Sequence, residues 1–125
     1  MIVSSDLRAA SAPSAIESAP EALRIATHAV KFPEVPALLD NGARRGLLDV
    51  RKATEFAAGH LRNARNIAHT RLRPRLDEVS ADFPLLVHCA SGLRAAGACA
   101  FLSRAGRENI CIADKFENAP KELLA

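Results

Sequence analysis

The 125-residue sequence predicts an α/β fold in which helices cover a parallel, doubly wound β-sheet. Three observations lead to this prediction. Short apolar runs of strand length recur along the chain, helical segments alternate with them, and short turns separate the two. Nearly half of the residues are hydrophobic and a quarter are charged, which is ordinary for a globular protein. A chain of this length forms one core, so we expect a single folded domain.

The first part of the chain divides into an extension and the start of the domain. Residues 1–22 are rich in Ala, Ser and Pro, and their two prolines discourage one continuous helix. We therefore expect a flexible N-terminal extension over 1–22 and a folded domain over 23–125. A first strand is expected within 28–32. A short helix over 33–40 follows, stopped by Asn41-Gly42, a pair typical of helix ends.

The middle of the chain predicts two further strands and two helices. Residues 46–51 read as a buried parallel strand, and a short helix over 54–58 ends at Gly59. A third strand is expected within 64–68. Residues 69–81 predict a helix broken or begun near Pro74, with three apolar residues at core-like spacing: Leu72, Leu76 and Val79.

The last third predicts the centre of the sheet. Three apolar residues at 85–87 form a short buried strand, and the alanine-rich segment 95–102 is helical, with Gly106 just beyond its end. The last strand is expected over 109–113. A short helix within 116–125 follows Pro120.

Cys89 lies where a strand ends and a helix begins. In an open α/β sheet this edge binds ligands, because loops leave the strands there and helix N-termini point inward. Successive backbone N–H groups and the positive helix end favour an anion, and the thiolate form of a cysteine, at this position. Arg94 adds a fixed positive charge. The sequence therefore predicts a nucleophile, Cys89, inside an anion-binding loop of Ala90, Ser91, Gly92, Leu93 and Arg94.

A structural interpretation of the cysteines competes with this one. Free cysteine is among the most buried residue types and usually acts as a small apolar side chain. For Cys99 and Cys111 nothing in the sequence suggests more than core packing. Three cysteines with neither C-x-x-C nor zinc-ligand spacing indicate reduced thiols, which fits a cytoplasmic protein without a metal site. The four histidines also fall in no ligand spacing.

The composition limits the kinds of molecule that this chain is expected to bind. The chain has no Trp or Tyr, so a base-stacking platform for nucleic acid is not expected. No apolar run reaches the length of a membrane span, and the N-terminus lacks the pattern of a signal peptide. Five arginines gather in the middle of the chain. They form either a solvated face or a field that attracts small anionic substrates or an acidic partner protein. They are Arg62, Arg65, Arg71, Arg73 and Arg75.

Across roughly residues 30–118, the sequence resembles the rhodanese-like domain family of single-domain sulfurtransferases. The residues that carry the resemblance are Leu47-Leu48-Asp49-Val50-Arg51, Glu55-Phe56, Gly59-His60-Leu61, Ala64, Asn66-Ile67, Cys89, Gly92 and Arg94. The resemblance implies a five-stranded parallel sheet with helices on both faces. The sequence departs from the family pattern at Arg62-Asn63, at Asn118-Ala119-Pro120 and at Asp114-Lys115, where the family usually has a glycine pair.

The resemblance also implies a chemistry. Cys89 would take a sulfane sulfur from a thiosulfate-like or persulfide donor and pass it to a thiol or cyanide. The intermediate is a covalent persulfide, so no separate cofactor is expected. Asp49 and Arg51 would support the loop, either as a structural ion pair or by touching substrate. Glu55 and His60 fit roles in starting a helix and fixing a loop. His88 should point away from Cys89 by strand alternation.

Two other functions remain open at this stage. Phosphatases and arsenate reductases of the same fold use a cysteine loop one residue longer, with room for a tetrahedral oxyanion. Only four residues separate Cys89 from Arg94, which suits a single sulfur atom. Rhodanese-like domains also act as sulfur carriers or regulatory binding modules.

Overall fold

A computed structural model describes residues 29–40 and 44–125. Five strands form one sheet in the order β1-β5-β4-β2-β3, and every neighbouring pair is parallel, which confirms the predicted fold class. The strands form where the sequence predicted them; four of them end earlier than predicted, and β4 continues one residue further, to His88. The strands are β1 (Ala29–Val30), β2 (Gly46–Asp49), β3 (Ala64–Asn66), β4 (Leu85–His88) and β5 (Asn109–Ile112).

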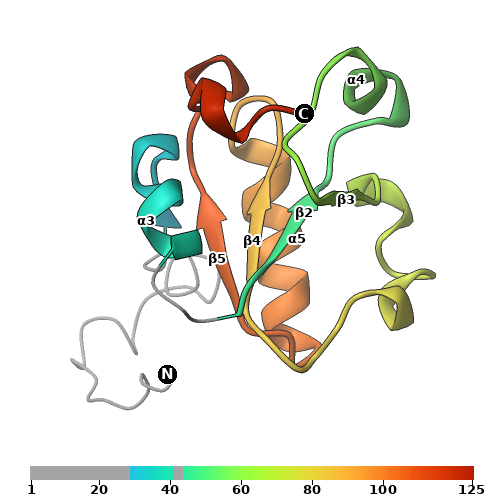
Figure 1. The fold of residues 1–125 in the computed structure, drawn as a ribbon. Helices are drawn as coiled ribbons and strands as arrows, with labels where there is room; N and C mark the ends of the chain where they lie inside the picture. The colour runs from blue at the N-terminus through green and yellow to red at the C-terminus, as the bar shows by residue number, and fades with distance from the viewer. Residues whose placement is uncertain (1–28, 41–43) are drawn as a thin grey trace.

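In the described residues, three α-helices and five short 3-10 turns lie between the strands or follow the last one (Figure 1). The helices are α3 (Val35–Asp40), α4 (Ala53–Ala58) and α5 (Leu93–Arg104). The turns are η3 (Phe32–Glu34), η4 (His69–Arg71), η5 (Leu76–Glu78), η6 (Phe116–Asn118) and η7 (Lys121–Leu123).

Three sequence predictions about these connections were wrong in detail. Residues 69–81 hold η4 and η5 instead of a helix, because Pro74 has no N–H to continue a helical ladder. Phe32 begins η3 instead of ending a strand, since Pro33 stands in the first turn. The expected C-terminal helix consists of η6 and η7, divided at Pro120.

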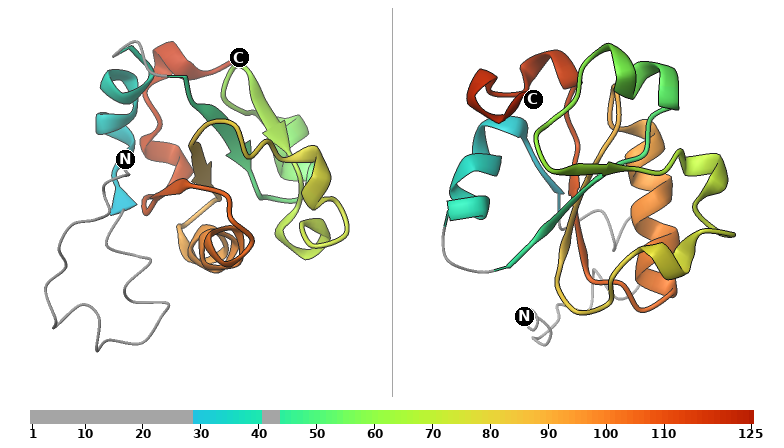
Figure 2. Two further views of the ribbon diagram at one scale, coloured as in Figure 1. Left: turned by 90° about the horizontal axis from the view of Figure 1, so that it is seen from below. Right: turned by 45° about the vertical axis from the view of Figure 1, so that its right-hand side comes forward.

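The two faces of the sheet carry separate apolar clusters, so helices cover both faces, as predicted (Figure 2). α5 and the segment around η4 and η5 cover one face. η3, α3 and the C-terminal turns cover the other. The first cluster centres on Leu48, Val50, Leu72, Val79, Val87, Cys89, Cys99, Leu102 and Cys111. The second centres on Phe32, Val35, Leu47, Leu61, Leu86 and Ile112.

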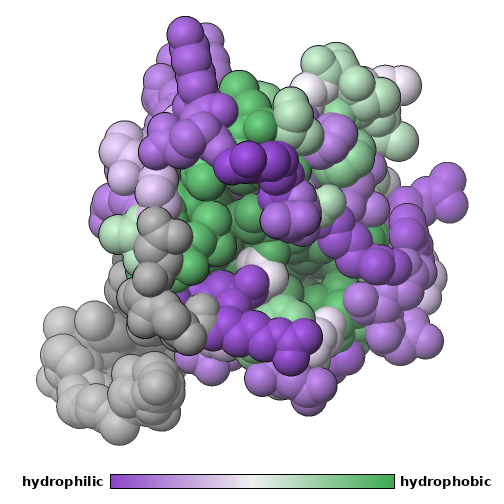
Figure 3. Space-filling model, viewed as in Figure 1, coloured by the Kyte–Doolittle hydropathy of each residue, from purple (hydrophilic) through white to green (hydrophobic). Residues whose placement is uncertain are grey.

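Strand β4 is central and all four of its residues are buried. Alternation along the strand sends Val87 and Cys89 into the cluster under α5, and Leu86 into the opposite one. The face of the sheet away from α5 is hollowed in the space-filling view, where apolar residues are ringed by hydrophilic ones (Figure 3). Because of this alternation, the consecutive residues His88 and Cys89 at the end of β4 lie on opposite faces of the sheet.

The N-terminal extension, the part of the first strand at His28 and the helix stop at Asn41-Gly42 lie outside the described residues. Within the part of the chain that the structure describes, no helix has the length and apolar character needed to cross a bilayer.

Candidate active site

The loop between β4 and α5 begins at Cys89 and turns at Gly92. Gly92 has φ +102°, in the left-handed region that side chains rarely adopt. A Cβ built there would lie 3.4 Å from both the Cα of Ala113 and the backbone nitrogen of Asp114, which follow β5. Gly92 therefore lets the loop make a sharp turn while lying close to the end of the neighbouring strand.

The Cys89 sulfur receives two backbone hydrogen bonds at the start of α5. Gly92 N–H donates to Sγ at 3.0 Å and Ala95 N–H donates at 3.2 Å. The Cys89 residue is fully buried. Backbone donors and the positive end of a 12-residue helix favour negative charge on the sulfur. Sequence reasoning expected donors from Ala90 to Arg94, and it missed Ala95.

Arg94 is held by a carboxylate on a neighbouring helix. Its Nη1 and Nη2 donate to Oε1 and Oε2 of Glu55 at 2.8 and 3.0 Å. The Glu55 side chain also accepts the Lys52 N–H at 2.9 Å at the start of α4. These hydrogen bonds, that from Arg94 first, lower the pKa of Glu55 to about 2. The predicted helix-start and loop-fixing roles of Glu55 match these contacts, and Arg94 ties the start of α5 to α4.

Asp49 and Arg51 form an ion pair that is almost wholly removed from solvent. Arg51 Nη2 donates to Asp49 Oδ2 at 2.7 Å, and Arg51 N–H donates to Oδ1 at 2.9 Å. Nη2 also donates to the carbonyl of Gly59 at 2.7 Å, and Asn66 Nδ2 donates to the carbonyls of both charged residues. Of the two roles left open by the sequence, these contacts are those of the structural ion pair.

Phe116 connects this ion pair to the loop. The Arg51 guanidinium lies 4.0 Å from the centre of the Phe116 ring. The Phe116 N–H donates to the Ala90 carbonyl at 2.9 Å. Ala90 is thereby fixed from the side of η6, a contact that the sequence did not indicate. The only available signal was the position of Phe116 in the segment that follows the last strand, four positions after its end.

The departure from the family pattern at Asp114 has a structural use. Asp114 Oδ2 accepts the Phe32 N–H at 2.9 Å, and Oδ1 accepts from Asn118 Nδ2 at 2.7 Å and from the Lys115 N–H at 2.8 Å. These hydrogen bonds, that from Asn118 first, lower the pKa of Asp114. The carboxylate therefore fixes the chain between β5 and η6, directly beside the turn at Gly92.

His88 lies on the opposite face of the sheet from Cys89, as strand alternation predicts. Its ring stacks on Phe116 at 5.5 Å and meets the edge of Phe32 at 5.6 Å. Neither ring nitrogen has a hydrogen-bond partner in the described structure, and Nε2 lies 3.6 Å from Asp49 Oδ2. Burial lowers the pKa of His88 more than the Asp49 charge raises it. This geometry does not place His88 as a base for Cys89.

The remaining predicted residues lie at the surface or in the core. Ser91 is exposed, and Leu93 is 82% exposed beside the loop. Cys99 and Cys111 are buried free thiols of the cluster under α5, which fits the predicted packing role. His60 follows α4, and its ring stacks on Phe56 with the ring centres 3.8 Å apart. Among residues 29–40 and 44–125, no group of three potential metal ligands occurs.

The fold and the site together define a class: a parallel α/β domain with a cysteine at the carboxyl end of its central strand and backbone donors around the sulfur. The sequence profile of the rhodanese-like domain family matches residues 32–116. The chain therefore belongs to the rhodanese-like domain family, which includes sulfurtransferases.

Similar proteins agree with this assignment. A curated relative, the uncharacterized protein YqhL of Bacillus subtilis, is 37% identical over 60 residues, and the match spans 48% of each chain, about half of that relative's length. A rhodanese-like domain protein from Staphylococcus aureus has the same fold, with a TM-score of 0.70 over 78% of this chain and 95% of that one at 22% identity. The reduced CoADR-RHD of Bacillus anthracis gives 0.64 at 29% identity, over 71% of this chain and 16% of that one.

Proposed function

We propose that this protein is a sulfurtransferase that moves a sulfane sulfur from an anionic donor to a thiol or cyanide through a persulfide on Cys89. One observation carries the proposal. The Cys89 sulfur receives two backbone N–H groups, from Gly92 and Ala95, at the N-terminus of α5. Membership of a family that includes sulfurtransferases supports the same assignment.

The reaction is a two-step exchange at sulfur. In the first step the Cys89 thiolate attacks the outer sulfur of thiosulfate, a new S–S bond forms, and sulfite leaves with the electron pair of the broken bond. In the second step an acceptor thiolate attacks the outer sulfur of the persulfide, which restores the Cys89 thiolate and releases the acceptor persulfide. Cyanide in place of the thiolate gives thiocyanate. Charge and atoms balance in both steps without a further oxidant.

The loop offers donors to the outer sulfur of the persulfide. The first N–H groups of an α-helix have no acceptor within the helix, so those of Leu93 and Arg94 remain available at the start of α5. Donors aimed at the position where charge develops stabilise an anionic intermediate, as an oxyanion hole does. The four residues between Cys89 and Arg94 enclose a small space, which favours one sulfur atom over a phosphoryl group.

Access to the sulfur requires movement of the loop. Cys89 is fully buried, whereas its neighbours Ser91 and Leu93 are exposed. Two contacts close the loop: the Phe116 N–H bond to Ala90 and the Arg94 pair with Glu55. A small, compact anion is therefore the donor that this site favours, and each catalytic cycle includes a local opening.

The experiment that tests the proposal is intact mass spectrometry after brief incubation with thiosulfate. Wild type should gain the mass of one sulfur, and cyanide should remove it. Cys89→Ala should gain none. The matched control is Cys99→Ala, which removes a buried thiol of the same core and should load as wild type does. Equal loading of Cys89→Ala, or no loading of wild type by thiosulfate or by a persulfide donor, overturns the proposal.

The rate of the second step separates an enzyme from a sulfur carrier or regulatory module. A sulfurtransferase should turn over repeatedly with thiosulfate and cyanide in excess. A protein that loads Cys89 once but releases sulfur only to a protein partner would act as a carrier, and the turnover measurement would then contradict the enzymatic part of the proposal.

A further inference from the structure

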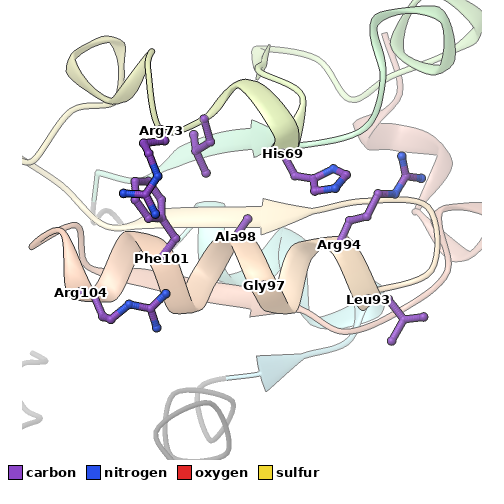
Figure 4. Close-up of a pocket in the computed structure, with 9 residues that line it drawn as sticks. His69, Arg73, Leu93, Arg94, Gly97, Ala98, Phe101 and Arg104 are labelled. Carbon is purple, nitrogen blue, oxygen red and sulfur yellow. The ribbon is translucent and has the colours of Figure 1, made fainter.

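A groove runs along α5, away from the loop that holds Cys89 (Figure 4). Its volume is about 420 Å³, within the range of sites that bind small molecules. One wall is the outer stripe of α5 and the other is the segment from η4 to Arg73. We call this the α5 groove, and its lining residues are His69, Leu72, Arg73, Leu93, Arg94, Gly97, Ala98, Phe101 and Arg104.

The α5 groove has an apolar floor that the fold holds in place. Leu72 and Ala98 are buried, and Phe101 is half-buried against the same core cluster. Gly97 widens the groove, because a Cβ at this helical position would meet no atom within 4 Å. Positions 94, 97, 98, 101 and 104 recur at three- and four-residue spacing, so they share one face of the helix.

The charge of the α5 groove is positive. Three arginines line it, of which Arg94 is already paired with Glu55, and none of the lining residues in the described part of the chain is Asp or Glu. Figure 4 shows Arg94 and His69 at the end nearest the Cys89 loop, and Arg73 and Arg104 at the other end. The Arg73 guanidinium lies 4.8 Å from the centre of the Phe101 ring, which orients the cation above the apolar floor. The distal end therefore suits phosphate or carboxylate groups, which arginine binds well.

The spacing of these charges sets the length of a ligand. Arg104 lies ten positions after Arg94, and a rise of about 1.5 Å per residue places the two positions about 15 Å apart. Arg94 precedes Ala95, whose N–H donates to the Cys89 sulfur. A molecule whose reactive atom is at Cys89 must extend along the α5 groove for about that distance to reach Arg104.

We propose that the α5 groove binds the thiol that accepts sulfur from Cys89, and that this acceptor is an elongated small molecule with phosphate or carboxylate groups about 15 Å from its sulfur. The inference rests on the proposed function, since it assigns the acceptor of the same site. The acceptor thiolate attacks the outer sulfur of the Cys89 persulfide, the persulfide S–S bond breaks, and the electron pair returns to the Cys89 sulfur. The anionic end stays bound at Arg73 and Arg104.

Two thiols that share one arm test this assignment. Coenzyme A carries a thiol on a long arm that ends in phosphates, and pantetheine keeps the arm without them. With thiosulfate-loaded wild type, transfer to coenzyme A should show a KM about tenfold lower than transfer to pantetheine, and this preference should shrink with added salt. Equal KM values for the two thiols would overturn the proposal.

Charge variants locate the anionic end. Arg73→Gln and Arg104→Gln should each raise the KM for coenzyme A about fivefold, relative to the rate of transfer to cyanide by the same variant, and should leave the KM for pantetheine unchanged. Arg44→Gln is the matched control, because the Arg44 guanidinium also stacks on a phenylalanine, at 4.3 Å from the Phe83 ring, but Arg44 does not line the α5 groove. An equal rise in the KM for coenzyme A in Arg44→Gln would contradict the assignment of the anionic end to Arg73 and Arg104.

A steric pair of variants tests the groove without changing its charge. Gly97→Leu places a side chain in the open space and should raise the KM for both thiols, whereas Gly97→Ala adds one methyl group and should have a much smaller effect. Equal KM values for Gly97→Leu and wild type would show that the thiols do not lie in the groove.

Calorimetric titration of the Cys89→Ser protein with coenzyme A separates failure of this inference from failure of the proposed function. Binding that Arg104→Gln weakens would support the groove even if no persulfide forms. Normal sulfur loading of wild type without such binding would leave the proposed function intact and overturn the α5 groove as the acceptor site.

Discussion

His88 and Cys89 are consecutive residues at the end of the same strand, and both are fully buried, yet the structure treats them differently. The Cys89 sulfur receives two backbone N–H groups, whereas neither nitrogen of His88 has a hydrogen-bond partner among the residues that the structure describes. Strand alternation sends the two side chains to opposite faces. One face therefore offers backbone donors to the sulfur, and the other keeps a polar ring among aromatic side chains.

The difference shows how the loop is supported. On the Cys89 face the donors belong to the loop and to the first turn of α5, so they depend only on backbone conformation. On the His88 face the Asp49–Arg51 ion pair positions Phe116, whose N–H bonds the Ala90 carbonyl. The surroundings of the Cys89 sulfur are thus shaped by backbone, and the opposite face supplies the side chains that hold the backbone there.

The largest expected effect on the free energy of unfolding comes from removing one partner of the buried Asp49–Arg51 ion pair. Arg51→Met leaves the Asp49 carboxylate without its cation in the interior, which should cost about 3–5 kcal/mol of the free energy of unfolding. The same substitution at Arg94 is the matched control. That pair is 25–34% exposed at its side chains, so its loss should cost about 1 kcal/mol or less. Urea unfolding at neutral pH measures the stability of both variants. Equal losses of stability would contradict the larger contribution that we assign to the Arg51 ion pair.

The site shows which features a sequence can predict. Buried strands and the strand-to-helix position of Cys89 follow from local apolar runs, so the sheet and the place of this cysteine were predictable. Contacts between segments distant in sequence were not. Arg94 lies 39 residues from Glu55, and the Phe116 N–H bond to Ala90 depends on how the chain leaves β5. Residues 69–81 were misjudged because apolar spacing indicates burial, and two 3-10 turns can bury Leu72 and Val79 without a helix.

Substitution of the two glycines on either side of the start of α5 should give the next largest effect on stability. Gly92→Ala forces a side chain into the left-handed region close to Ala113 and should cost about 1–3 kcal/mol of stability. It should also slow sulfur loading, because the Gly92 N–H donates to Cys89. Gly97→Ala lies within the helix with open space around it and should stabilise the protein by up to about 1 kcal/mol. An unchanged or raised stability of Gly92→Ala would show that the turn at position 92 does not require glycine.

The smallest effect concerns the protonation of His88 and depends on pH. Burial is the main reason that the pKa of His88 lies below its ordinary value of 6.5, with the neighbouring Arg51 acting in the same direction and Asp49 opposing both. As pH falls below 6.5, the unfolded chain therefore takes up a proton before the folded protein does. Wild type should lose stability from this residue at up to about 1.4 kcal/mol per pH unit, until the pH reaches the folded-state pKa.

The variant His88→Leu isolates this contribution because it keeps an apolar side chain between Phe32 and Phe116 and removes the titrating group. Urea unfolding of both proteins at pH 7.5, 6.5 and 5.5 is the measurement, and all other titrating groups are common to the two. The stability of the variant relative to wild type should rise as the pH falls. A constant difference would mean that His88 accepts a proton as readily in the folded protein as in the unfolded chain, and that its aromatic surroundings do not oppose the charge.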